Sequence, residues 1–295
     1  MILELWGTRG SIPTPGESTR KYGGNTACVA LRMGDKYWII DCGSGLRSCG
    51  IAAKKEFGNK RTHINMLVSH THWDHIQGFP FFLPFYIPNF SFTIHGGIGL
   101  DGDLEHLLMN QMDSNYFPVN LGELAAKFDF VNLMGEPTVI DEVKVSTHYL
   151  NHPGMSLAFR IEYQNKVFVY ATDNEPYIEM FKLKNAIKTP EDLTFSQSLE
   201  NKYLDFIHGA DLLLADAQYT RAEYANFIGF GHSFMEYAIE NAFHANVKKL
   251  LLFHHDPMHD DDFIDEYFAK MQTLAAANYP RLELLIAKDG DKIEF

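Results

Sequence analysis

The segment at residues 70–75, His-Thr-His-Trp-Asp-His, constrains this chain more than any other stretch of it. It follows the apolar run 64–69, which has the composition of a buried strand. Imidazole and carboxylate are ligands that zinc, manganese and iron accept, and a short loop leaving a strand can turn several such side chains toward one point. The segment contains no lysine, arginine or glycine. It therefore predicts a metal site rather than a chance surface cluster of histidines.

Length and composition predict one large folded domain. The chain has 295 residues, of which 46% are hydrophobic, and no repeat or linker divides residues 1–295. Its formal charge of -13 argues against a surface that follows the phosphates of a long nucleic acid. No apolar run approaches the roughly 20 residues of a membrane helix, and no secretory signal opens the chain. We therefore expect a cytoplasmic protein, no membrane partner and three reduced thiols at Cys28, Cys42 and Cys49.

Apolar runs and turn residues predict an α/β fold with two mixed sheets flanked by helices. A second, antiparallel set of strands follows the first, with a turn at Gln164-Asn165, and the last third alternates strands with helices. Pro190 is expected to break the helical pieces between residues 173 and 210, and residues 260–262 to cap the final helix. The expected strands are residues 2–6, 27–33, 37–40, 64–69, 139–147, 156–163, 167–171, 212–215, 250–253 and 282–287.

Residues 79–90 hold three prolines among aromatic side chains and cannot form one long regular element. Two interpretations are open. The segment either forms a hydrophobic rim that contacts substrate or a second subunit, or it fills the core beneath a loop. Together with the aromatic residues at 116–118, it suggests a homodimer.

Further metal donors stand where other strands are expected to end. His152, Asp173 and His254 each follow a predicted strand, and strand ends are where such scaffolds carry their sites. Because Asp74 and His75 are consecutive and point away from His70 and His72, two ions are a better match to the loop than one.

These residues together resemble the metallo-β-lactamase superfamily, whose fold is an αββα sandwich. The resemblance implies that His70, His72 and His152 hold one divalent ion, that Asp74, His75 and His254 hold the other, and that Asp173 bridges them. It also implies that Asp41 orients the histidine loop from outside the ligand set. Zinc is the expected metal, with manganese and iron as alternatives, because the ligand types suit all three.

Two stretches resemble the phosphodiesterase branch of this superfamily, which includes ribonuclease Z, phosphoribosyl cyclic phosphodiesterase and cyclic-nucleotide phosphodiesterases. One is residues 210–219, which contain Asp216, and the other is Gly231-His232-Ser233. We expect His232 to contact a phosphate oxygen, Asp216 to hold His232 in the donating tautomer, and Ser233 to cap a helix. The glycine-rich opening around Arg9 either approaches a phosphate or simply makes two tight turns.

The expected activity is hydrolysis of a small phosphodiester, preferably a cyclic nucleotide or cyclic phosphate. A hydroxide bridging the ions attacks phosphorus, with Asp74, Asp216 and His232 assisting. One alternative is tRNA 3′-end processing as in ribonuclease Z, although only 20 residues separate His152 from Asp173, where that family carries its tRNA-binding arm. The other is a lactone or thioester hydrolase on the same metals. Phosphoribosyl cyclic phosphodiesterases carry N-terminal zinc-binding cysteines that this chain lacks.

Overall fold

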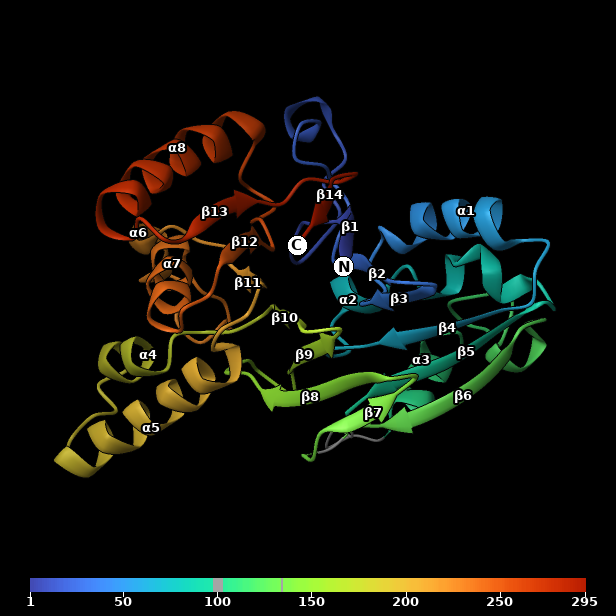
Figure 1. Ribbon diagram of the computed structural model, residues 1–295, viewed down its shortest axis with the longest axis horizontal. Coiled ribbons are helices and arrows are strands. Elements are labelled where there is room, and N and C mark those ends of the chain that lie inside the picture. Colours follow the sequence, from blue (N-terminus) through green and yellow to red (C-terminus); the bar gives the residue numbers. More distant parts are fainter. Residues whose placement is uncertain (98–102, 134) are drawn as a thin grey trace. The chain divides into compact units, whose positions relative to one another are not determined.

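The computed structural model describes residues 1–97, 103–133 and 135–295, and the chain divides into two compact units. Residues 1–134 and 288–294 belong to the first unit, and residues 135–287 with Phe295 belong to the second. Each unit contains one mixed, seven-stranded sheet and several helices (Figure 1). The expected α/β class with two mixed sheets is thereby confirmed.

The sheet of the first unit has the strand order β14-β1-β2-β3-β4-β5-β6. β14, β1, β2 and β3 pair antiparallel, whereas β3, β4, β5 and β6 pair parallel. The strands are β1 (Ile2–Gly7), β2 (Cys28–Met33), β3 (Lys36–Ile40), β4 (Thr62–Leu67), β5 (Phe90–Gly96), β6 (Lys127–Asn132) and β14 (Lys292–Glu294), and the helices are α1 (Leu46–Phe57), α2 (Trp73–Ile76) and α3 (Leu104–Gln111).

The sheet of the second unit has the order β13-β12-β11-β10-β9-β8-β7. β7 to β10 pair antiparallel, and β10 to β13 pair parallel, with α7 packed against β11 and β12. The strands are β7 (Thr138–Ile140), β8 (Val143–Tyr149), β9 (Leu157–Tyr163), β10 (Lys166–Ala171), β11 (Leu212–Asp216), β12 (Lys249–Phe253) and β13 (Glu283–Ile286), and the helices are α4 (Tyr177–Leu183), α5 (Pro190–Ile207), α6 (Arg221–Tyr224), α7 (Met235–His244) and α8 (Asp261–Asn278).

Two local predictions were wrong for identifiable reasons. The strand expected at 139–147 is two strands, because Asp141 and Glu142 both take positive φ and make a two-residue hairpin turn like the predicted one at Gln164-Asn165. Pro190 does not break a helix. It opens α5, where a missing N–H costs nothing, and Thr189 caps the helix through the N–H of Asp192.

The aromatic segment 79–90 mostly fills the core of the first unit. Phe79, Phe82, Phe85 and Phe90 are fully buried. The ring of Phe85 lies 4.7 to 5.0 Å from the rings of Phe79, Phe82, Phe92 and Phe128, in tilted and edge-to-face arrangements. The core-filling interpretation therefore holds for most of the segment.

A few aromatic side chains near this segment do face solvent. Phe81 is 57% exposed and Tyr116 is 80% exposed. Within the described residues, no helix is both long enough and apolar enough to cross a membrane.

We predict that Phe85→Ala lowers the free energy of unfolding by about 3–5 kcal/mol, because it leaves a cavity among four aromatic rings. Phe81→Ala, on the same segment but exposed, should change it by no more than about 0.5 kcal/mol. Chemical denaturation of both variants measures the difference. Equal losses would contradict the assignment of Phe85 to the core.

Candidate metal centre

The histidine loop of the first unit begins where β4 ends. β3 and β4 are parallel neighbours, with Ile40 paired to Leu67, so the residues that follow them meet at one edge of the sheet. Asp41 follows β3, and Ser69 with His70 follows β4. The short helix α2 then begins after His72 and carries Asp74 and His75. Parallel pairing thus brings Asp41 to the base of the histidine loop.

The Asp41 carboxylate is the anchor of that loop. It is fully buried and accepts three hydrogen bonds, from the Ser69 amide, the Ser69 hydroxyl and Nδ1 of His75, each at 2.7 Å. Its φ of 59° lies in the left-handed region, which aspartate tolerates better than most residues. Because a carboxylate only accepts, the proton of His75 sits on Nδ1, and Nε2 presents its lone pair.

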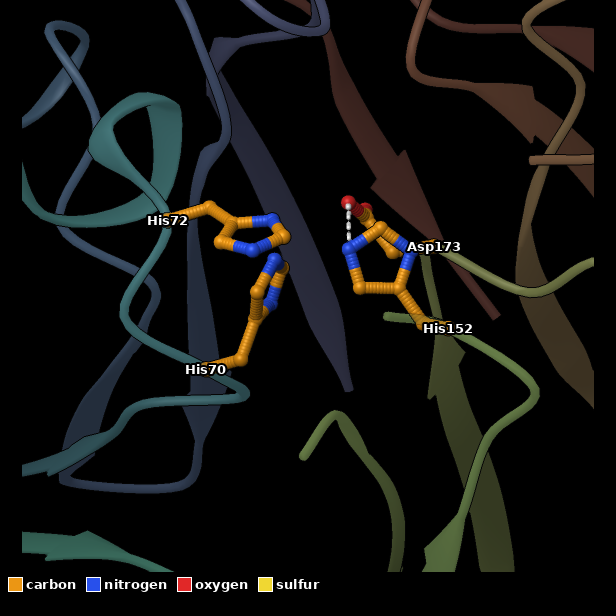
Figure 2. Close-up of side chains that lie close together, drawn as sticks. All are labelled: His70, His72, His152 and Asp173. Carbon is orange, nitrogen blue, oxygen red and sulfur yellow. Dashed lines mark ion pairs between the residues drawn. The ribbon is translucent and has the colours of Figure 1, made fainter. Parts of the chain in front are cut away.

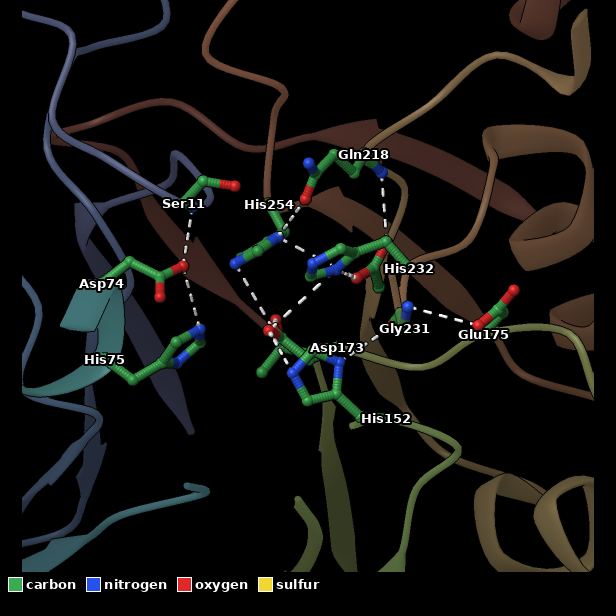
Figure 3. Close-up of polar contacts among 12 residues, drawn as sticks. Ser11, Asp74, His75, His152, Asp173, Glu175, Gln218, Gly231, His232 and His254 are labelled. Atoms are coloured by element: carbon green, nitrogen blue, oxygen red, sulfur yellow. Dashed lines mark hydrogen bonds and ion pairs between the residues drawn. The ribbon is translucent and has the colours of Figure 1, made fainter. Parts of the chain in front are cut away.

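The Asp74 carboxylate is held by two neighbours. Its Oδ2 accepts a hydrogen bond of 2.7 Å from the amide of Ser11 and lies 3.4 Å from Nε2 of His75 (Figure 3). Arg9, in the same opening loop as Ser11, is fully buried and donates from Nε to the Gly23 carbonyl at 2.8 Å. The loop therefore orients Asp74 through its backbone, and Arg9 braces the turn rather than facing outward.

The other two histidines of the loop complete this cluster. The rings of His70 and His72 lie edge-to-face with centroids 4.6 Å apart (Figure 2), and His70 lies 4.2 Å from His75. His70 is buried, whereas His72 is exposed. The first unit thus gathers three imidazoles and one carboxylate, which we call the loop cluster: His70, His72, Asp74 and His75.

A second cluster forms at the carboxyl edge of the parallel strands β10, β11 and β12. Ala171 pairs with Ala215, and Asp216 pairs with Phe253, so the three strands end together. Asp173, Asp216 and His254 stand at or just beyond these ends. One ligand atom from each of Asp173, Asp216, His232 and His254 lies within 4.8 Å of the others.

The carboxylate of Asp173 lies at the middle of this second cluster (Figure 3). Its Oδ1 is 3.3 Å from Nε2 of His254, and its Oδ2 is 3.7 Å from Nε2 of His152, which follows β8. Asp173 and His254 are buried, and both take positive φ, at 53° and 66°. Such backbone conformations are uncommon outside glycine and often mark functional positions. The Asp173 cluster comprises His152, Asp173 and His254.

The outer ring nitrogens of these histidines are already engaged. Nδ1 of His152 lies 2.9 Å from the Gly231 carbonyl. Nδ1 of His254 lies 3.0 Å from Oε1 of Gln218, whose own amide donates to Asp256 at 3.2 Å. Both acceptors fix the proton on Nδ1, so the lone pair of Nε2 turns toward Asp173. This is the arrangement that metal-ligating histidines adopt, and the nitrogen and oxygen donors suit zinc, manganese or iron.

His232 is paired with Asp216. Its Nδ1 lies 2.8 Å from Oδ2 of Asp216 and 4.0 Å from Oδ2 of Asp173, and its ring stacks on His254 at 5.0 Å. With Asp216 as a carboxylate, the neutral ring carries its proton on Nδ1 and presents a lone pair at Nε2. The expectation of a neutral donating tautomer is therefore refined: His232 can donate outward only as an imidazolium, which Asp216 stabilises.

Ser233 does not cap the helix that follows it. α7 begins at Met235, and the residue before it is Phe234. The Ser233 amide and hydroxyl instead donate to Oδ1 and the carbonyl of Asp216, at 3.0 and 2.7 Å. The predicted cap was wrong because the side chain is used to fix Asp216.

Tyr219 lies beside this pair, with its ring 6.1 Å from the ring of His232 and stacked on Phe227 at 4.6 Å. Burial raises the pKa of Tyr219 well above its usual value, and the charge of Asp216 raises it further. Its hydroxyl therefore stays protonated over the physiological range.

The predicted metal ligands thus lie in the loop cluster and the Asp173 cluster, and the predicted catalytic pair Asp216 and His232 lies beside the Asp173 cluster. The sequence reasoning missed the residues that hold the ligands in place. Ser11 and Gly231 act through backbone groups, and the type of a residue does not predict the contacts of its backbone. Gln218 lies two residues after Asp216, and a polar side chain so close to a predicted strand end was the available signal. The missed supporting residues are Ser11, Ser69, Glu175, Gln218 and Gly231.

Comparison with known proteins identifies the family. The model of the beta-lactamase superfamily domain matches residues 37–255, which is most of the chain and contains both clusters. The chain belongs to the metallo-β-lactamase superfamily. Proteins of this fold bind divalent metal ions, in keeping with the two clusters.

Among its superfamily relatives, ribonuclease Z of Picrophilus torridus is 24% identical over 286 residues, covering 88% of this chain and 87% of the relative. Among solved structures, the metallo-β-lactamase fold protein YhfI from Bacillus subtilis aligns with a TM-score of 0.68 and 17% identity, over 100% of this chain and 98% of that one. Human tRNase Z, short form, aligns with a TM-score of 0.63 and 17% identity, over 100% and 99%. The structural matches support the metallo-β-lactamase fold.

We predict that Asp41→Asn weakens metal binding about 10- to 100-fold, because the new amide nitrogen cannot accept from His75 or Ser69. Asparagine tolerates the left-handed backbone, so the substitution tests hydrogen bonding rather than strain. Competition with a chelating indicator measures the affinity. The control is Asp35→Asn, whose carboxylate side chain is 94% exposed, and wild-type affinity in Asp41→Asn would contradict the anchoring role.

Proposed function

We propose that this protein is a binuclear metal-dependent phosphodiester hydrolase in which the two units act as a single hydrolase domain. Residues of the loop cluster and the Asp173 cluster would share two divalent ions. His70, His72 and His152 would hold one, Asp74, His75 and His254 the other, and Asp173 would bridge them. Bound ions would supply Lewis acidity to a phosphoryl oxygen and to the leaving group.

The observation that carries the proposal is the Asp216–His232 pair. A nucleophile and two ions are enough for many hydrolases of this superfamily, but an imidazolium braced by a buried carboxylate adds a donor of strong, charged hydrogen bonds. His232 lies beside Asp173, with Nδ1 4.0 Å from Oδ2 of that carboxylate, and Nε2 is the ring nitrogen that would meet an oxygen of a substrate bound there. A phosphodiester anion benefits from such a cation more than a neutral ester or lactone does.

The residues around the proposed metal ions have different roles in catalysis. Asp74 and Asp173 bring negative charge to the ligand set, and Ser11 orients Asp74. Asp216 keeps His232 in one orientation and favours its protonated form. His232 then donates from Nε2 to a non-bridging oxygen or to the departing alkoxide, which offsets the charge that develops in the transition state.

The relatives favour RNA as the substrate. Two curated relatives that cover most of this chain are named ribonuclease Z, one of them from Staphylococcus carnosus and 24% identical over 100% of both chains. We therefore place cleavage of a phosphodiester near an RNA 3′ end first among the candidate reactions.

A small diester, such as a cyclic nucleotide or cyclic phosphate, is the second candidate. The chain from His152 to Asp173 is occupied by β9 and β10, joined by the two-residue turn at Gln164-Asn165. That span leaves no room for the tRNA-binding arm that ribonuclease Z carries there. The formal charge of -13 also disfavours a long polyanion.

We predict that zinc- or manganese-loaded protein hydrolyses bis(4-nitrophenyl) phosphate, and that His232→Gln lowers kcat about 10²- to 10⁴-fold without loss of metal. His148→Gln, which alters a histidine outside both clusters, should leave kcat unchanged. A precursor tRNA with a 3′ trailer and a set of cyclic nucleotides, assayed on the same preparation, separate the two substrate candidates. Cleavage of a lactone or thioester with no diester hydrolysed would overturn the proposal.

A further inference from the structure

Glu175 lies two residues beyond Asp173 and has no place in the ligand set. Glu175 is 2% exposed, and its carboxylate accepts three hydrogen bonds from the end of α6 and the loop that follows it. Oε1 accepts from the amide of Gly229 at 2.7 Å and from the hydroxyl of Tyr224 at 2.9 Å. Oε2 accepts from the amide of Gly231 at 3.2 Å (Figure 3). In the described part of the chain, the structure gives Glu175 no ion-pair partner.

The loop that Glu175 holds also orients a predicted metal ligand. The carbonyl of Gly231 accepts from Nδ1 of His152 at 2.9 Å. Gly231 has φ of +88°, and a Cβ there would lie 2.1 Å from Nδ1 of His152, so only glycine lets the backbone come this close. The carboxylate thus fixes the N–H of Gly231, while the adjacent carbonyl of that residue fixes His152.

The backbone of Glu175 also forms hydrogen bonds with the residue that precedes His152. Its amide donates to the Asn151 carbonyl at 2.8 Å, and its carbonyl accepts from Nδ2 of Asn151 at 2.9 Å. Asn151 directly precedes His152. A closed ring of hydrogen bonds therefore runs from Glu175 through Gly231 to His152 and back through Asn151.

We propose that Glu175 is a positioning residue that sets the tautomer and orientation of His152 through the loop at residues 229–231. Because a carboxylate has no proton to donate, it can face three donors at once, which a neutral amide cannot. The same loop leads directly into His232, so one buried charge fixes both a predicted metal ligand and the predicted proton donor. The inference rests on the proposed metal-binding role of His152, and not on the identity of the substrate.

The neighbouring tyrosine is consistent with this role. Burial raises the pKa of Tyr224 far above its usual value, and the charge of Glu175 raises it further. The phenol therefore stays protonated and continues to donate to the carboxylate. Loss of that one donor would still leave both glycine amides on Glu175, so Tyr224→Phe is a milder version of the same perturbation.

The test is Glu175→Gln, in which the amide nitrogen would face at least one of the loop donors. We expect zinc affinity, measured by competition with a chelating indicator, to fall about 10- to 100-fold. In the metal-free protein, the ¹⁵N shifts of the His152 ring should change from a single Nδ1–H tautomer in the wild type to a mixture in the variant. Tyr224→Phe should change both readouts in the same direction by a smaller factor.

Glu200→Gln is the matched control. Glu200 is also a buried carboxylate of the second unit, and it accepts from Tyr237 and Asn241 without touching either cluster. The Glu200→Gln variant should be less stable than the wild type, but its zinc affinity and the tautomer of His152 should be unchanged. If folded Glu175→Gln keeps both as well, the positioning role is overturned. These readouts need no substrate, so they remain decisive even if wild-type protein cleaves no phosphodiester.

Discussion

The parallel pairing of β10, β11 and β12 is the constraint on which the rest of the Asp173 cluster depends. Three strands that run the same way in register end at one edge, and the residues that follow them are brought together without any contact between neighbours in sequence. The first unit uses the same device with β3 and β4, which bring Asp41 under the histidine loop. Each cluster is therefore a consequence of strand direction, and a shift of register would separate its members.

Proton placement is the second level of organisation. His75, His152 and His254 each have Nδ1 committed to an oxygen, from Asp41, Gly231 and Gln218 respectively. The result is the same for all three: Nε2 keeps its lone pair and faces a carboxylate. Nδ1 of His232 is paired with the carboxylate of Asp216 in the same way as Nδ1 of His75 is paired with that of Asp41. In the proposed function, His75, His152 and His254 use Nε2 to hold metal, whereas His232, once protonated, donates from Nε2 to the substrate.

Much of this site was predictable because its ligands have chemical side chains at strand ends. The composition of residues 70–75 predicted the histidine loop. The positions of His152, Asp173 and His254 after apolar runs predicted the remaining ligands. What could not be predicted acts through the backbone. Positive φ at Asp41, Asp173 and His254, the carbonyl of Gly231 and the amide of Ser11 leave no trace in residue type.

The fold shows the same division. Strands with clear apolar runs were predicted to within two residues, whereas β5, β6 and β14 were missed, although β5 and β6 alternate apolar and polar residues as half-buried strands do. Pro190 was misassigned because the same residue can break a helix or begin one, and the capping Thr189 decides between them. That signal is local: Thr189 directly precedes Pro190, and Asp192 completes the cap three residues after Thr189.

The count of bound metal ions tests the proposed function most directly, because that proposal makes His70 and His152 ligands of the same ion. Metal analysis after exhaustive dialysis should find two ions per wild-type chain. His70→Ala and His152→Ala should each lose one, and the double variant should still retain one, because both residues serve the same ion. A double variant with no metal, or a His152→Ala variant that keeps both ions, would contradict the account.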